Sequence, residues 1–227
     1  MHRSIALTAL GLLGAGIPHG NGPATVATRF DPPPRCQRVA AEPGSFGAWL
    51  RALPLKPEGW PVHLYDGRLK ANQQVHAAVI DLSVGDRDLQ QCADAVMRLH
   101  AEHLFATGRQ DAIAFHFTNG FLAEWQRWRA GERIAVEGDR CRWLRRAEPD
   151  ASHAELMRFL TIVFTYAGTL SLERDLQPVA AEDLRLGDVF VDGGSPGHAV
   201  IVVDLARDPE GRTYLMLAQS YMPAQEI

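Results

Sequence analysis

A histidine and a cysteine are the residues of this chain whose type and setting are best suited to chemistry. His198 opens a short β-branched run, residues 199–203, directly after a turn rich in glycine. A rigid strand fixes the orientation of an imidazole ring, so a histidine at this place can act as a base or as a ligand. The alternative is a structural histidine that hydrogen-bonds a carbonyl group at the end of its strand.

Cys92 is the candidate nucleophile for that base. A catalytic cysteine reacts as its thiolate, which a helix N-terminus or a neighbouring imidazolium stabilises. Residues 86–105 predict a helix, because apolar residues recur on one face at helical spacing, and Gly108 ends it. Cys92 is then expected one to two turns inside that helix on its apolar face, where burial disfavours the charged form. The alternative is a small hydrophobic residue of the core.

Two further groups invite a chemical interpretation. Ser152 precedes a helical pattern and is followed by Glu155, so it is expected to cap a helix rather than to attack a substrate. His100 and His103 lie one helical turn apart and can chelate a metal, but no partner motif supplies the remaining ligands. We therefore predict no metal site and no cofactor.

The elements that must position these residues predict an α+β fold with an antiparallel C-terminal sheet and packed helices. The segment 130–149 carries many arginines interleaved with acidic residues, which indicates a solvated face rather than a site for an anionic glycan. Trp125 and Trp128 are expected to anchor the core rather than to stack on a sugar. Helical patterns cover residues 46–52, 86–105, 121–129 and the stretch from Ser152 to Gly168, and strand patterns cover 75–82, 112–117, 189–191, 199–203 and 214–218.

Composition and charge bound the class of protein. The chain has 227 residues, of which 46% are hydrophobic and 22% charged, so it can bury a sizeable core. A net charge of -4 gives no electrostatic case for binding nucleic acid. Residues 1–27 predict a signal peptide, with a basic start and an apolar stretch too short to span a bilayer; the alternative is an unstructured apolar tail. We expect one α+β domain over residues 28–227, exported to the periplasm or cell envelope, without an integral membrane span.

The cysteines are three in number, which leaves at least one thiol unpaired in an oxidising compartment. Cys36 and Cys141 lie in polar segments and are the favoured pair, with Cys92 as the free thiol. Three unpaired thiols are the alternative.

Residues 150–204 resemble the catalytic half of NlpC-type cell-wall peptidases, a papain-like family. The sequence Asp-Ala-Ser at 150–152 stands where that family has Asp-Cys-Ser at a helix start. The Gly-Asp pair at 187–188 and then His198 match the family's next two motifs. The resemblance implies a papain-like fold in the C-terminal half. The chain departs from the family at Ala151, because alanine offers no nucleophile.

The same resemblance implies a polar residue on the following strand that orients the histidine, and Gln219 matches it. The order cysteine then histidine along the chain agrees with Cys92 as nucleophile, and Gln90 or Gln91 would supply oxyanion donors. Two hypotheses remain open. The chain is either a thiol hydrolase or amidase acting on cell-envelope peptide or amide bonds, or a non-catalytic module that binds envelope peptide or glycan.

A second resemblance covers nearly everything after residue 30. The chain is similar to a bacterial family of uncharacterised exported proteins, domain of unknown function 4846. This resemblance implies no activity, and it implies a chain that continues past Ile227. The matching segments are Gly-Ser-Phe-Gly-Ala-Trp-Leu-Arg at 44–51, Val-His-Leu-Tyr-Asp-Gly at 62–67, Cys-Ala-Asp-Ala at 92–95, Phe-Thr-Asn-Gly at 117–120, Tyr-Ala-Gly-Thr at 166–169, Pro-Gly-His-Ala-Val-Ile-Val-Val at 196–203 and Ala-Gln-Ser-Tyr-Met-Pro-Ala-Gln at 218–225.

Overall fold

The computed structural model describes residues 23–227, and its helices and antiparallel strands give the α+β fold that the sequence predicts. The strands are β1 (Gln37–Arg38), β2 (Ala114–His116), β3 (Leu122–Glu124), β4 (Glu132–Glu137), β5 (Arg140–Arg145), β6 (Val189–Asp192), β7 (His198–Arg207) and β8 (Thr213–Ala218). The α-helices are α1 (Val26–Arg29), α2 (Phe46–Arg51), α3 (Cys92–Ala106), α4 (Trp125–Arg129), α5 (His153–Tyr166) and α6 (Thr169–Asp175), with short 3₁₀ turns η1 (Gln110–Ala112) and η2 (Ala181–Asp183).

Strand β7 is the centre of the main sheet, and it pairs antiparallel with β1, β6 and β8. Its first residue, His198, faces Asp192 of β6, and the ladder with β8 ends at the pair Ile201 and Ala218. Alternate β7 residues, Ala199 and Ile201, are fully buried in the hydrophobic core. The predicted antiparallel C-terminal sheet is therefore confirmed.

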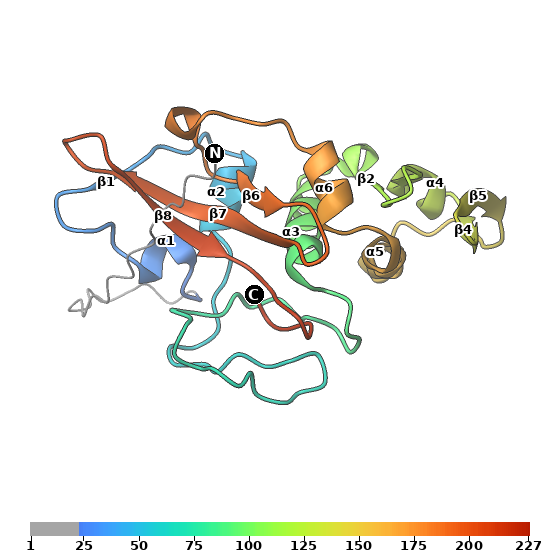
Figure 1. Ribbon diagram of the computed structural model, residues 1–227, viewed down its shortest axis with the longest axis horizontal. Helices are drawn as coiled ribbons and strands as arrows, with labels where there is room; N and C mark the ends of the chain where they lie inside the picture. The colour runs from blue at the N-terminus through green and yellow to red at the C-terminus, as the bar shows by residue number, and fades with distance from the viewer. Residues whose placement is uncertain (1–22) are drawn as a thin grey trace.

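Helix α3 is the central helix, because it is buried on nearly all sides and packs against β7 (Figure 1). It begins at Cys92, so the predicted start at residue 86 is wrong. The chain before it is held by two short backbone bonds, from Leu89 N–H to the Arg87 carbonyl and from Gln91 N–H to the Leu89 carbonyl. Each bond spans only two residues, whereas an α-helical bond spans four. The backbone of Gln91, the N-cap residue of α3, is extended. Gly108, with a φ of 73°, follows the helix end.

Residues 110–166 form a second region, called here the outer half, which lies at the right of Figure 1. The polar segment 130–149 contains the hairpin β4–β5, which the sequence interpretation missed. A buried residue of α5 ties the region together. The Glu155 carboxylate accepts hydrogen bonds from Trp128 Nε1 at 2.7 Å, from Arg133 at 2.5 Å and from Arg158 at 2.8 Å. In this way α4, β4 and α5 share one carboxylate.

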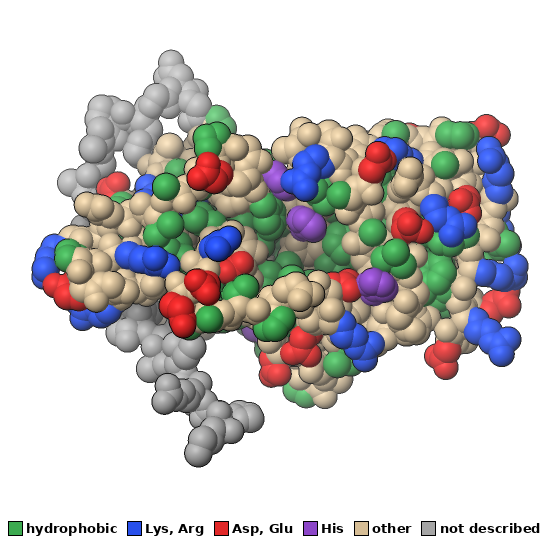
Figure 2. Space-filling model, turned by 90° about the horizontal axis from the view of Figure 1, so that it is seen from above, with side chains coloured by type: hydrophobic (Ala, Val, Ile, Leu, Met, Phe, Trp, Pro, Cys, Tyr) green, Lys and Arg blue, Asp and Glu red, His purple; other side chains and the backbone are tan. Residues whose placement is uncertain are grey.

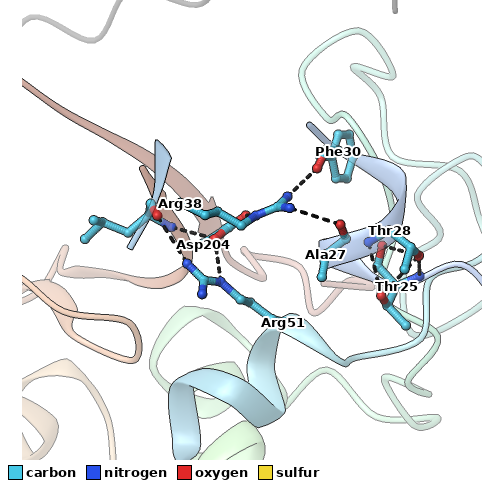
Figure 3. A network of polar contacts seen from close by, with 8 residues as sticks. Thr25, Ala27, Thr28, Phe30, Arg38, Arg51 and Asp204 are labelled. Carbon is cyan, nitrogen blue, oxygen red and sulfur yellow. Dashed lines mark hydrogen bonds and ion pairs between the residues drawn. The ribbon is translucent and has the colours of Figure 1, made fainter. Parts of the chain in front are cut away.

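The main sheet together with α2, α3 and residues 219–227 is called here the sheet half. A buried carboxylate ties the N-terminal segment to this sheet. Asp204 of β7 accepts from Arg38 of β1 and from Arg51 of α2, each at 2.6 Å (Figure 3). Arg38 donates in addition to the carbonyl groups of Ala27, within α1, and of Phe30, its C-cap residue. One side chain of the sheet therefore holds α1, β1 and α2 in place.

Two predictions made from the sequence are wrong, and one concerns residues that are mostly outside the described range. The predicted strand over residues 75–82 is absent from the described chain, where Ile80 makes only an isolated bridge to Leu55 and Val75 is exposed. The favoured bridge between Cys36 and Cys141 is wrong, since both thiols are free. Most of the predicted signal peptide lies outside the described residues. Within residues 23–227, every helix is too short or too polar to cross a membrane.

Candidate functional site

Cys92 is the first residue of α3, so its thiol lies at a helix end. The first N–H groups of a helix have no partner within the helix, and together with the helix dipole they favour negative charge. A thiolate is stabilised in that setting. The residue is 9% exposed and is separate from the main hydrophobic cluster. The thiol is thus placed at a helix end, not one to two turns inside the helix as the sequence suggested.

His198 and Gln219 are brought together as the resemblance implied. The distance from His198 Nε2 to Gln219 Oε1 is 2.6 Å. An amide oxygen can only accept a hydrogen bond, so Nε2 carries the hydrogen atom and a neutral ring keeps its lone pair on Nδ1. The edge of the ring also meets Tyr221, at 5.5 Å between ring centroids. Nδ1 is therefore the nitrogen left to act as a base.

The turn between β6 and β7 fixes where His198 begins its strand. Thr169, at the start of α6, accepts a hydrogen bond from Gly194 N–H at 3.3 Å through its hydroxyl and donates to the Gly194 carbonyl at 3.2 Å. A Cβ atom on Gly197 would collide with the same hydroxyl and would lie 2.7 Å from the Asp192 carbonyl oxygen. Only glycine fits there, so helix α6 and the turn set the position of His198.

The end of β8 meets the start of α3 through side-chain hydrogen bonds. Ser220 Oγ lies 2.8 Å from the carbonyl oxygen of Gln90, two residues before Cys92. Asp88 Oδ1 accepts from the backbone N–H of Ala224 at 2.6 Å and from Gln91 Nε2 at 3.2 Å. The structure thus joins the segment that carries the thiol to the segment that carries Gln219.

Gln90 and Gln91, the glutamines expected as oxyanion donors, make contacts within the protein instead. Gln90 Oε1 accepts from Arg98 at 3.2 Å, and the Gln90 Nε2 group is enclosed, with no hydrogen-bond partner among the described residues. Gln91 donates to Asp88. Neither amide is free to meet a substrate, so the donors available at this helix end are backbone N–H groups.

Asp94 is a site residue that sequence reasoning missed. Its Oδ2 accepts from Gln91 N–H at 3.0 Å, while Oδ1 is enclosed without a partner among the described residues. Burial raises the pKa of this carboxyl group from 3.8 to about 7. The Cys-Ala-Asp run at the start of a helix was the available signal, had the start been placed correctly.

The helix in which the NlpC resemblance seeks a nucleophile is α5, and it does not occupy the central place. It packs against α4, with Phe159 beside the rings of Trp125 and Trp128, whereas α3 packs against β7. Ser152 caps α5 by accepting from Glu155 N–H at 3.3 Å, as expected. Ala151 therefore does not mark a nucleophile lost from the helix beside the sheet.

The remaining candidates serve packing. His100 and His103 lie against the ring of Phe46, at 5.4 and 5.2 Å, and burial lowers the pKa of both histidines. No group of three potential metal ligands occurs within residues 23–227. Figure 2 shows basic and acidic side chains intermingled on the right end of this face, where the outer half lies. This mixture is the solvated face that the sequence indicated.

The fold and the site together define an α+β protein with a thiol at the start of α3 and a histidine–glutamine pair at the start of β7, the strand on which α3 packs. The chain belongs to the family described as domain of unknown function (4846), whose family model matches residues 26–227. Searches of curated proteins and of solved structures gave no match.

Proposed function

We propose that the protein is a thiol hydrolase or amidase that uses Cys92 as nucleophile, His198 as base and Gln219 as the residue that orients the histidine. The observation that carries this proposal is the placement of Cys92 as the first residue of α3, the helix that packs on the strand opened by His198. A thiol, a base and an oriented second nitrogen are the parts that nucleophilic catalysis by cysteine requires.

The reaction follows from these parts. His198 Nδ1 takes the thiol proton, and the Cys92 thiolate attacks the carbonyl carbon of the substrate. Backbone N–H groups of the first turn of α3 stabilise the negative oxygen of the tetrahedral intermediate. The imidazolium then protonates the leaving amine as the carbon–nitrogen bond breaks. Water hydrolyses the thioester, with His198 as base, and restores the thiol.

Alkylation by iodoacetamide tests the nucleophile directly. The variant with Cys36→Ser and Cys141→Ser leaves Cys92 as the single thiol. We expect Cys92 in the folded protein to react about tenfold faster than in the urea-unfolded chain, because the helix end and the histidine favour the thiolate. His198→Ala should slow the reaction of the folded protein about tenfold, since a general base contributes a factor of this size or larger.

The matched control is His116→Ala. His116 is also a strand histidine, with Nδ1 2.6 Å from a carboxylate oxygen of Asp175, but it belongs to β2. Its removal should leave the alkylation rate unchanged. A Cys92 that reacts no faster when folded, or that is indifferent to His198, would refute the proposal.

We propose peptide or amide bonds of the cell envelope as the substrate class, on the NlpC resemblance. The probe is purified peptidoglycan, and the measurement is release of soluble fragments and new amino groups by the wild-type protein but not by Cys92→Ala. If the protein binds peptidoglycan without releasing products, and its thiol is unreactive, the chain is instead a binding module.

A further inference from the structure

Ser220 is a buried hydroxyl that stands between the two parts of the proposed site. The residue is 0% exposed. Its Oγ lies 2.8 Å from the Gln90 carbonyl oxygen and 2.7 Å from the Gln225 carbonyl oxygen, and it accepts from Gln225 N–H at 3.2 Å. One hydroxyl therefore joins the segment before α3 to both ends of the turn that follows β8.

The positions of these partners along the chain show that the contact joins the segment of the thiol to the segment of Gln219. Gln90 lies two residues before Cys92, and Ser220 directly follows Gln219. The ladder between β7 and β8 ends at Ala218, so Gln219 lies beyond the last paired residue of its strand. The first anchored side chain after Gln219 is Ser220. The contacts of Ser220 thus fix the position of Gln219 relative to the start of α3, and Gln219 in turn fixes the ring of His198.

We propose that Ser220 is a positioning residue that holds the His198–Gln219 pair in register with the Cys92 thiol. This inference rests on the proposed thiol chemistry. A buried hydroxyl suits the task because its hydrogen bond is directional and adds no charge beside the thiolate. A shift of a fraction of an ångström between nucleophile and base is costly, since proton transfer requires hydrogen-bond geometry.

The segment keeps other anchors when this hydroxyl is removed, so a variant is expected to fold. Asp88 still accepts from Ala224 N–H, and Leu64 still bridges to Gln225. Ser220→Ala therefore removes the link to Gln90 without detaching residues 219–227 from the loop beside them.

A double-mutant cycle in the full chain with Cys36→Ser and Cys141→Ser measures this role, with iodoacetamide as the probe. Ser220→Ala should slow alkylation of Cys92 about tenfold, close to the effect of His198→Ala. In the Ser220→Ala background, His198→Ala should slow it by less than about twofold, because the base is already out of register. This non-additivity is the readout that a general loss of stability would not produce.

The matched control is Thr161→Val, in α5 of the outer half. The Thr161 hydroxyl likewise donates to a backbone carbonyl, that of Met157 at 2.8 Å. We expect Thr161→Val to leave the effect of His198→Ala unchanged, and urea unfolding measures the stability that each of the two variants loses.

Two results separate the inference from the proposal on which it rests. If His198→Ala has no effect on Cys92 with Ser220 intact, the proposed thiol chemistry fails. If His198→Ala is effective but costs the same factor with and without Ser220→Ala, the chemistry stands and the positioning role of Ser220 is overturned.

Discussion

Each half of the molecule has a buried carboxylate that receives arginines, Glu155 in the outer half and Asp204 in the sheet half, whereas the links made by Ser220 and by His198 with Gln219 are neutral hydrogen bonds. In the outer half, Arg127 pairs with Glu132 at 2.6 Å while its guanidinium stacks on Trp143 at 4.8 Å. Around the thiol, the links run from a serine hydroxyl to a carbonyl and from an imidazole to an amide. Arg127, Arg133 and Arg158 are thus used in holding the elements of the outer half together.

The difference shows why a run of arginines was a poor guide to a binding site here. A guanidinium that already has a carboxylate and an aromatic ring as partners has little left to offer a ligand. The links made by Ser220 and by His198 with Gln219 involve no arginine, so they do not depend on these ion pairs. If this is correct, changes in the two halves should separate stability from thiol reactivity.

The largest expected effect breaks the outer half alone. Glu155→Ala removes the shared acceptor of Trp128, Arg133 and Arg158 and leaves a largely buried guanidinium unpaired, which costs about 3–5 kcal/mol of unfolding free energy. Urea unfolding measures the loss, and the rate of Cys92 alkylation should not change. In the control Glu137→Ala, an exposed pair with Arg142 is lost, at a cost below about 1 kcal/mol. Equal costs would contradict the comparison.

An intermediate effect should appear in the sheet half, at the turn before β7. Gly197→Ala forces a Cβ atom onto the Thr169 hydroxyl and displaces the turn, at a cost of about 1–3 kcal/mol. Unlike Glu155→Ala, it should also slow alkylation of Cys92, because His198 moves with the turn. Gly168→Ala is the control, since a Cβ atom there meets nothing within 4 Å. A stable Gly197→Ala with unchanged alkylation would show that the turn does not set the histidine.

The last comparison of the halves uses the sign of a pH dependence rather than the size of a loss. Asp94 has a pKa of about 7 in the folded state against 3.8 ordinarily, so between these values the folded state binds more protons than the unfolded chain. Stability should therefore fall as pH rises from 4 to 7, with a slope of at most about 1.4 kcal/mol per pH unit, and Asp94→Asn should flatten this slope.

Asp150, in the outer half, should act with the opposite sign. The hydrogen bond from the Ser152 backbone lowers its pKa, so the stability that it contributes is present above pH 4 and is lost on acidification. Chemical denaturation between pH 3 and 7 compares Asp94→Asn with Asp150→Asn. The same sign for both variants would rule out this account of Asp94.

The elements of the C-terminal sheet were readable from sequence because local patterns and tertiary context agree there. Short β-branched runs bounded by glycine became β6 and β7, and Ser152 capped α5. The Glu155 side chain makes no hydrogen bond to the backbone of Ser152, as it would in a capping box. Glu155 turns away from the cap to receive Trp128 and two arginines, which are distant in sequence and invisible to a local rule.

The parts that sequence reasoning missed depend on contacts of that distant kind. Strand β4 has three apolar residues together between charged ends, and β5 carries three arginines, so the hairpin β4–β5 shows no clean alternation from which strands could be predicted. The pattern over residues 86–91 merges with the helix that follows, so only the bond from Gln91 N–H to Asp94 marks the start of α3. Misplacing that start by six residues removed Cys92 from the helix end and made it look like a core residue.

The carboxylate of Asp204 couples the local unfolding of segments that are otherwise independent. Arg38 and Arg51 both pair with this carboxylate, and Arg38 also donates to the carbonyl groups of Ala27 and Phe30 in and after α1, so the loss of either arginine leaves the carboxylate with one partner fewer. Local opening of the N-terminal segment is thereby coupled to that of α2. We therefore expect α1, β1 and α2 to detach from the rest of the sheet half as a single cooperative unit.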